Sequence, residues 1–106
     1  MTRDEQSRSE GRAKILKALA HPSRVFIIEA LNKQSHCVCE LTDMIGADTS
    51  TVSKHLSILK NAGIVRDEKR GTSVYYSLQC PCVITLLGCI ENVIKSNLEQ
   101  QYAYLK

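Results

Sequence analysis

The chain contains five cysteines, and four of them form two close pairs. Cys37 and Cys39 flank a valine, while Cys80 and Cys82 flank a proline. Thiolates are soft ligands that favour zinc, cadmium, lead and copper(I) and, by the same logic, trivalent arsenic or antimony. Thiolates also react with oxidants and with other thiols. The two pairs therefore predict a site for a thiophilic metal or metalloid, or a redox site.

Length and composition limit the kind of protein that carries these pairs. The chain has 106 residues, 43% hydrophobic and 24% charged, which suits one folded domain with one core and excludes a multidomain enzyme. It has no run of 18 apolar residues and no apolar stretch of the signal-peptide type behind its charged N-terminus. We therefore expect a cytoplasmic protein. Because the cytosol is reducing, its cysteines indicate metal ligands, redox thiols or buried side chains that fill the core rather than disulfides.

Two helices are expected before the first pair. Apolar residues between Ser9 and Ala20 recur at helical spacing, and residues 1–8 are expected to form a flexible arm. Pro22 suits the first position of a second helix, whose apolar run continues to Leu31. His36, just before the pair, is expected to be exposed.

Two short helices joined by a glycine-containing turn come next, an arrangement typical of a helix-turn-helix. The first starts beside Cys37 and Cys39 and ends at Gly46. Its expected inward residues are Val38, Leu41, Met44 and Ile45. Asp48 suits the N-cap of the second helix, and its expected buried residues are Val52, Leu56 and Leu59.

The second helix and the segment after it are suited to nucleic acid. Strands are expected at 64–67 and 73–78, joined through Gly71 as a hairpin or wing. Residues 49–72 carry five cations against two carboxylates, a net charge of +3, whereas residues 29–48 carry one lysine against four carboxylates, a net charge of −3. In a helix-turn-helix the second helix enters the major groove, and flanking cations meet phosphates. The expected DNA-contacting residues are Thr49, Ser50, Thr51, Ser53, Lys54, His55, Arg66, Lys69 and Arg70. A histidine packed within the fold is an equal alternative for His55.

A long final helix is expected from Pro81 to Tyr104. Its apolar surface is too broad for a core of this size to cover, which predicts a homodimer built partly on residues 81–104. Cys89 lies among its apolar residues and is expected to be buried and inert. Residues 1–106 are thus expected to form a single winged-helix DNA-binding domain, mainly α with a small β-hairpin: a winged helix-turn-helix, homodimeric through its terminal helices.

Several stretches together resemble the ArsR/SmtB family of dimeric winged-helix repressors. They are Leu16 to Arg24, Glu40 with Leu41, Ser50 to Val65, and Gly71 to Leu78 with its paired tyrosines. The resemblance covers about residues 13–95. It implies that the ligand-free protein binds double-stranded operator DNA, and that a metal ion, metalloid or thiol-reactive species releases it. The resemblance implies no permanent cofactor for the protein.

The segment from Cys37 to Leu41 is similar to the signature of the family's arsenic, antimony, cadmium and lead sensors. The best-known arsenic sensors have a third cysteine where this chain has Thr42, and residues 1–36 lack the N-terminal cysteines of the cadmium and lead sensors. A third thiolate would come from Cys80 or Cys82, in the same or the partner chain, with Cys89 less suitable. We therefore expect trivalent arsenic or antimony as the inducer, because three thiolates suffice for them.

Two alternatives remain open. The same repressor fold could sense cadmium, lead, zinc or mercury, or a redox or persulfide signal in which a thiol beside the helix-turn-helix pairs with one of the last helix. A thiol oxidoreductase or metal carrier would instead lack operator affinity, and the Cys-x-x-Cys spacing typical of such oxidoreductases is absent. No arrangement of nucleophile, base and orienting group is recognisable, so we expect no enzymatic activity.

Overall fold

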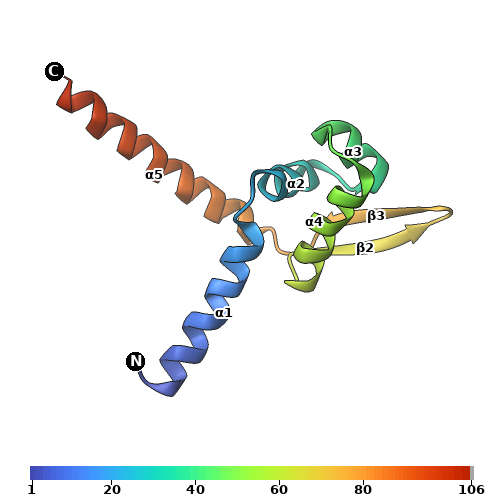
Figure 1. Ribbon diagram of the computed structural model, residues 1–106, viewed down its shortest axis with the longest axis horizontal. Coiled ribbons are helices and arrows are strands. Elements are labelled where there is room, and N and C mark those ends of the chain that lie inside the picture. Colours follow the sequence, from blue (N-terminus) through green and yellow to red (C-terminus); the bar gives the residue numbers. More distant parts are fainter. Residues whose placement is uncertain (106) are drawn as a thin grey trace.

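Two long terminal helices project from a small central body (Figure 1). The computed structural model describes residues 1–105. The hairpin of the two longer strands extends on the side away from the last helix. In chain order the elements are α1 (Arg3–Leu19), α2 (Pro22–Lys33), β1 (His36–Cys37), α3 (Val38–Ile45), α4 (Thr49–Asn61), β2 (Val65–Arg70), β3 (Ser73–Leu78) and α5 (Cys82–Tyr104).

The first helix begins earlier than its apolar spacing indicates. The Thr2 hydroxyl accepts a hydrogen bond from the Glu5 amide at 3.1 Å, and the Glu5 carboxylate accepts one from the Thr2 amide at 2.8 Å. This reciprocal capping box satisfies two amide groups that a helix start otherwise leaves unpaired. Residues 3–8, expected as a flexible arm, are therefore helical.

The helix-turn-helix forms as expected. Gly46 ends α3 with φ of 79°, in the left-handed region that favours glycine. Asp48 then caps α4, because its carboxylate accepts a hydrogen bond from the Thr51 amide at 2.8 Å. Hydrogen bonds from Thr51 and Ser50 hold the pKa of the Asp48 carboxyl below its usual value. The turn between the helices is thus fixed by local backbone chemistry.

The core lies between α2, α3, α4 and the base of the hairpin, where the end of α1 joins it. Its fully buried side chains are Ile27, Ile28, Leu41, Val52, Leu56, Leu59, Ile64 and Val65. The three from α4 are the residues expected there. Met44 was expected to face inward, but it is 48% exposed. It lies at the edge of the apolar stripe of α3, lining a shallow hollow with Phe26 and His36.

A two-residue strand that sequence patterns did not predict joins α3 to the hairpin. In the antiparallel sheet β3 lies between β1 and β2. His36 is paired with Tyr76 and Cys37 with Tyr75. The first cysteine pair is therefore fixed to the middle of β3 as well as to the start of α3.

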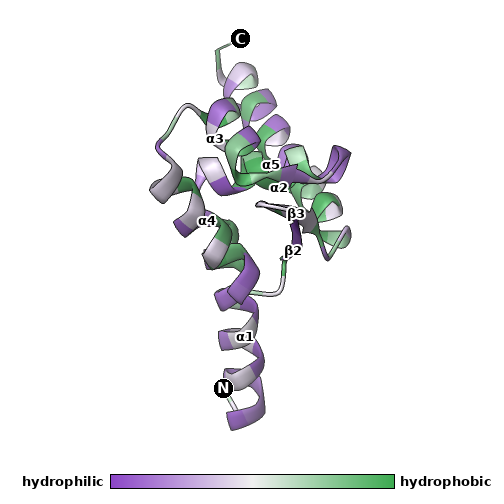
Figure 2. Cartoon of the chain, turned by 90° about the vertical axis from the view of Figure 1, so that its right-hand side faces the viewer, coloured by the Kyte–Doolittle hydropathy of each residue, from purple (hydrophilic) through white to green (hydrophobic). Residues whose placement is uncertain are grey.

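The terminal helices leave a broad apolar surface uncovered within the single chain. Hydrophobic residues run along α5 (Figure 2), and its exposed members are Ile90, Val93, Ile94 and Leu98. A hollow of about 670 Å³ between α1, α2 and α5 is lined by Leu16, Phe26 and Leu87, among others. Cys89, expected to be buried, is exposed in the single chain. Among residues 1–105, no helix is long and apolar enough to cross a membrane.

Candidate nucleic-acid interface and cysteine site

The N-terminal half of α4 presents a polar surface. Thr49, Ser50, Thr51 and Lys54 are exposed, and Ser53 is half-buried. The apolar residues of the same helix are buried in the core, so these polar side chains point away from it. Hydroxyls and an ammonium group on an exposed helix start can reach base edges and phosphates. The structure thus brings together most of the residues that the sequence indicated for DNA contact.

His55 lies instead against α2. The guanidinium of Arg24 donates a hydrogen bond from Nη1 to Nδ1 of His55 at 3.1 Å, because a guanidinium can only donate. The ring of His21 lies 4.4 Å from that of His55, centroid to centroid. Burial, followed by the nearby His21 and Arg24, lowers the pKa of His55. These contacts favour a packed histidine over a phosphate contact.

Arg24 also binds the end of α1. Its Nε donates to the carbonyl oxygen of Ala18 at 2.7 Å, and its Nη2 donates to that of Lys17 at 3.4 Å. One guanidinium therefore joins three helices, and it fixes α4 relative to α1 and α2.

The cations of the wing lie on two different faces. Residues that are paired across two neighbouring strands project from the same face of the sheet, and successive residues along one strand project from opposite faces. Arg66 and Arg70 lie on one face, where Arg70 contacts Glu68 at 3.5 Å and stacks 4.6 Å from the centroid of Tyr75. Lys69 lies on the other face. Arg66 and Arg70 therefore form one basic edge, to which Lys69 does not belong.

An ion pair ties the wing to α4. Lys60 Nζ lies 2.8 Å from Asp67 Oδ2. The hydrogen bond between them raises the pKa of Lys60 and lowers that of Asp67. Lys60 is thereby partly neutralised and is directed to the hairpin, so we do not place it among the DNA contacts.

A basic hollow beside α4 was not found by sequence reasoning. Lys14 and Lys17 of α1 lie with Arg24 around a hollow of about 360 Å³ that Ile58 and Asn61 of α4 also line. The two lysines stand three residues apart, a spacing that places them on one helix face. That spacing was visible in the sequence, but the approach of α1 to α4 was not.

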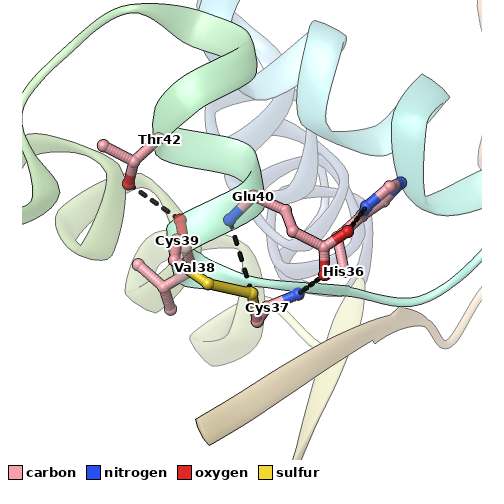
Figure 3. The surroundings of a disulfide bond; sticks show 6 residues. All are labelled: His36, Cys37, Val38, Cys39, Glu40 and Thr42. Carbon is pink, nitrogen blue, oxygen red and sulfur yellow. Dashed lines mark hydrogen bonds and ion pairs between the residues drawn. A yellow bond between two sulfur atoms is a disulfide. The ribbon is translucent and has the colours of Figure 1, made fainter.

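The first cysteine pair forms a disulfide at the start of α3 (Figure 3). Cys37 is the N-cap of the helix, and its sulfur accepts a hydrogen bond from the Glu40 amide at 3.4 Å. Cys37 is buried and Cys39 is exposed. The sequence suggested free thiolates, or a thiol bonded to one of the last helix. The structure instead bonds the two neighbours, because the turn at the helix start places their Cα atoms 5.4 Å apart.

Glu40 connects this pair to a buried histidine. Its Oε1 accepts a hydrogen bond from the Cys37 amide at 3.2 Å, and its Oε2 lies 3.1 Å from His36 Nδ1. The bond from the Cys37 backbone, and then that from His36, lowers the pKa of Glu40. His36 was expected to be exposed, but only 7% of it is accessible, because its pairing with β3 draws it into the fold.

The other cysteines do not join the first pair within one chain. Cys80 follows Tyr75, the partner of Cys37, by five residues, which is about 16 Å of extended strand. Cys80, Cys82 and Cys89 are free thiols. Among residues 1–105 no group of three or more histidine, cysteine or acidic side chains could hold a metal ion. Within the described part of a single chain, Cys80 and Cys82 are therefore not gathered with the first pair.

Known proteins are similar to this chain in sequence and in fold. Residues 21–67 match the model of the bacterial regulatory protein, arsR family. An uncharacterised HTH-type transcriptional regulator of Mycobacterium tuberculosis is 32% identical over 96 residues, which are 90% of this chain and 84% of the relative. The cadmium resistance transcriptional regulatory protein CadC homolog of Staphylococcus aureus is 45% identical over 67 residues, 62% of this chain and 55% of that protein.

A solved structure agrees with these relatives. The homodimeric winged helix-turn-helix DNA-binding domain of a Mycobacterium bovis protein superposes with a TM-score of 0.79 and 26% identity, over 94% of this chain and 93% of that one. The relatives are transcriptional regulators, not enzymes. The polar start of α4, the turn before it and the basic edge of the wing are the parts expected of such a regulator, and this chain belongs to the arsR family of bacterial helix-turn-helix regulatory proteins.

Proposed function

We propose that this chain is a homodimeric, cytoplasmic transcriptional repressor that releases its operator when trivalent arsenic or antimony binds Cys37 and Cys39. The observation that carries the proposal is the position of this pair. The two sulfurs are adjacent at the start of α3, where Cys37 caps the helix-turn-helix and is paired with the wing strand β3. A ligand at this point touches both parts of the DNA-reading unit.

Two surfaces support binding of operator DNA by a dimer. The polar start of α4 fits the major groove, and the edge formed by Arg66 and Arg70 fits a flanking phosphate backbone. The apolar residues that α1 and α5 leave uncovered in one chain fit a second copy, and the Mycobacterium bovis neighbour is homodimeric. A two-fold dimer presents two α4 helices to the two half-sites of an operator.

The ligand count favours a metalloid. Arsenite, As(OH)3, reacts with two reduced thiols to form two As–S bonds and release two water molecules, and one hydroxide remains on arsenic. A third sulfur would have to come from the second chain. Structural zinc sites need four ligands, and the described part of a single chain gathers no group of three. The pair alone therefore suits trivalent arsenic or antimony better than a tetrahedral ion, although the CadC relative is a cadmium resistance regulator.

Release follows from the role of Cys37 in the structure. Its sulfur accepts the hydrogen bond that caps α3, and a bond to arsenic withdraws electron density from that acceptor. The start of α3 then loses a stabilising contact, and its position relative to α4 and β3 changes. A coupling free energy of about 1 to 3 kcal/mol per site lowers DNA affinity about 5- to 150-fold.

The test is a fluorescence anisotropy titration of the reduced protein on promoter DNA. Arsenite, antimonite, cadmium, zinc and a persulfide donor are added in parallel. We expect release at near-stoichiometric arsenite or antimonite. Cys37→Ser and Cys39→Ser should bind DNA normally and resist release, whereas Cys89→Ser should respond as the unmodified protein does. Release that survives in both of the first two variants would refute the site.

The disulfide favours one second candidate, a redox-responsive repressor at the same pair. A peroxide would oxidise the thiols of Cys37 and Cys39 to the disulfide and be reduced to water, and a thiol would restore them. In this case DNA affinity should follow the oxidation state without any metalloid. Loss of two titratable thiols in parallel with loss of DNA binding would support it, and unchanged affinity after full oxidation would exclude it.

A further inference from the structure

Tyr75 is paired with a residue on each side of it in the sheet. Its partner in β1 is Cys37, and its partner in β2 is Glu68. Because paired residues project from the same face, these three residues form one row across the three strands. Cys37 is buried, Tyr75 is half-buried and Glu68 is exposed. The row therefore runs from the first cysteine pair to the exposed wing.

Arg70 lies against this row. It stands two residues after Glu68 in β2, so it projects from the same face and is a diagonal neighbour of Tyr75. Its Cζ lies 4.6 Å from the centroid of the Tyr75 ring, and its Nη2 lies 3.5 Å from Glu68 Oε2. The ring therefore supports the flat face of the guanidinium, and Glu68 contacts one edge of it.

This stacking suits contact with a phosphate. A guanidinium stacks through its flat face, so its N–H groups stay in the plane and can still donate to an anion. The Arg70 side chain is half-exposed, which leaves such donors accessible. Tyr75 lies in the central strand of the sheet, so its ring is a firm support. It restricts a long side chain before DNA arrives, and this lowers the entropy cost of binding.

We propose that Tyr75 is a positioning residue for DNA binding, whose ring holds Arg70 at the operator backbone and links it to Cys37. The link follows from the sheet. The strand β1 has two residues, and the sulfur of Cys37 also caps α3 and takes part in the disulfide. A change at this sulfur therefore acts on the residue beside Tyr75. The inference rests on the proposed contact of the wing with DNA, but not on the identity of the inducer.

The first experiment measures how Tyr75 acts on Arg70, by anisotropy titration of the full reduced chain on promoter DNA. Tyr75→Leu should weaken binding about two- to fivefold per chain, as expected for loss of an exposed cation–π contact. Tyr75→Phe keeps the ring and should retain most of the affinity. In an Arg70→Ala background, Tyr75→Leu should have no further effect, because the side chain that it positions is gone.

Two further variants separate this role from an effect on folding. Arg70→Lys keeps the charge without the flat face and leaves the sheet intact, so it should weaken binding about as much as Tyr75→Leu does. Tyr104→Leu makes the same substitution as Tyr75→Leu at the exposed end of α5, and it should bind as the unmodified protein does. Circular dichroism verifies that each variant is folded.

The second experiment measures the link to Cys37 without a metalloid. The protein is compared in its disulfide form and after reduction by dithiothreitol, which supplies two electrons and two protons to the two sulfurs and becomes a cyclic disulfide. The DNA affinities of the two forms should differ at least about fivefold in the unmodified protein. The difference should largely disappear in Tyr75→Leu. Cys37→Ser, which cannot form this disulfide, should show no difference between the two treatments.

The positioning role would be overturned by full affinity of Tyr75→Leu, by an equal loss with Tyr75→Phe, or by a further loss in the Arg70→Ala background. The link to Cys37 would be overturned by equal affinities of the disulfide and dithiol forms, or by a difference that survives Tyr75→Leu. Failure of arsenite to release DNA would refute the proposed inducer alone, because no metalloid enters these titrations.

Discussion

Arg24 donates a hydrogen bond to His55 at 3.1 Å and thereby joins α2 to α4, the second helix of the helix-turn-helix. The same guanidinium donates to two carbonyls at the end of α1. One side chain therefore adds polar contacts to the core packing that holds α4 beside the end of α1.

Replacement of Arg24 should destabilise the fold. Arg24→Ala removes the donor of all three hydrogen bonds, two of which are partly buried, at a cost of about 2 kcal/mol. Urea unfolding at one fixed protein concentration measures this change, since dimer stability depends on concentration. The matched control, Arg12→Ala on the exposed face of α1, should differ from the unmodified protein by less than about 0.5 kcal/mol. Equal effects of the two substitutions would contradict the role assigned to Arg24.

Stability should fall in mild acid because of His55. Burial, His21 and Arg24 lower the pKa of His55 in the folded chain below its ordinary value of 6.5. The unfolded chain then binds the proton more tightly, so stability is flat above about pH 6.5 and decreases as the pH falls from there to the lower folded-state pKa. Urea unfolding between pH 5 and 8 tests this. His55→Gln, which keeps an acceptor for Arg24, should flatten the profile in that window, and an unchanged slope would assign the effect to other groups.

Local rules explain why much of the fold could be predicted from sequence. Pro22, Gly46 and Asp48 each have a backbone preference that acts within one turn, and the structure confirms the helix boundaries they indicated. The buried stripe of α4 follows from helical periodicity alone. The start of α1 was wrongly predicted because it is set by the capping box of Thr2 and Glu5. These residues are polar, so the spacing of apolar residues gives no sign of the helix there.

The cysteine site could be predicted only in part. The residues of the first pair and their place at a helix start follow from the sequence. The strand that pairs Cys37 with Tyr75 has two residues, too few for any period to appear, and it is this register that separates Cys80 from the first pair. The burial of His36 depends on the same strand. These features arise from contacts between distant segments, which no local pattern specifies.

The wing should contribute to DNA affinity mainly through its basic edge. Arg66→Ala removes an exposed cation of the wing, and each lost phosphate contact lowers the slope of log K against log salt by about 0.9 per chain. Anisotropy titrations at several salt concentrations measure this slope. Lys95→Ala on α5 removes the same charge far from the DNA-reading unit and should leave the slope unchanged. If both substitutions act alike, net charge rather than the wing edge controls affinity.

The apolar face of α5 should be required for dimerisation. Val93 is 59% exposed in the single chain, and Val93→Glu would place a charge in a face that a second copy covers. Sedimentation should show monomers and DNA affinity should fall at least tenfold. Asn92→Glu introduces the same side chain about 100° around the helix from Val93, on the polar face, and should remain dimeric. Dimers of Val93→Glu as stable as those of the unmodified protein would place the interface elsewhere.

The central claim is that a thiophilic inducer acts at Cys37 and Cys39 to release DNA. The most direct measurement is the anisotropy of promoter DNA bound to the fully reduced protein as arsenite is added, with Cys37→Ser and Cys39→Ser as parallel samples. We predict a loss of affinity of about 5- to 150-fold at near-stoichiometric arsenite, and none in the two variants. DNA that stays bound to the reduced, unmodified protein, or is released equally from the variants, would contradict it.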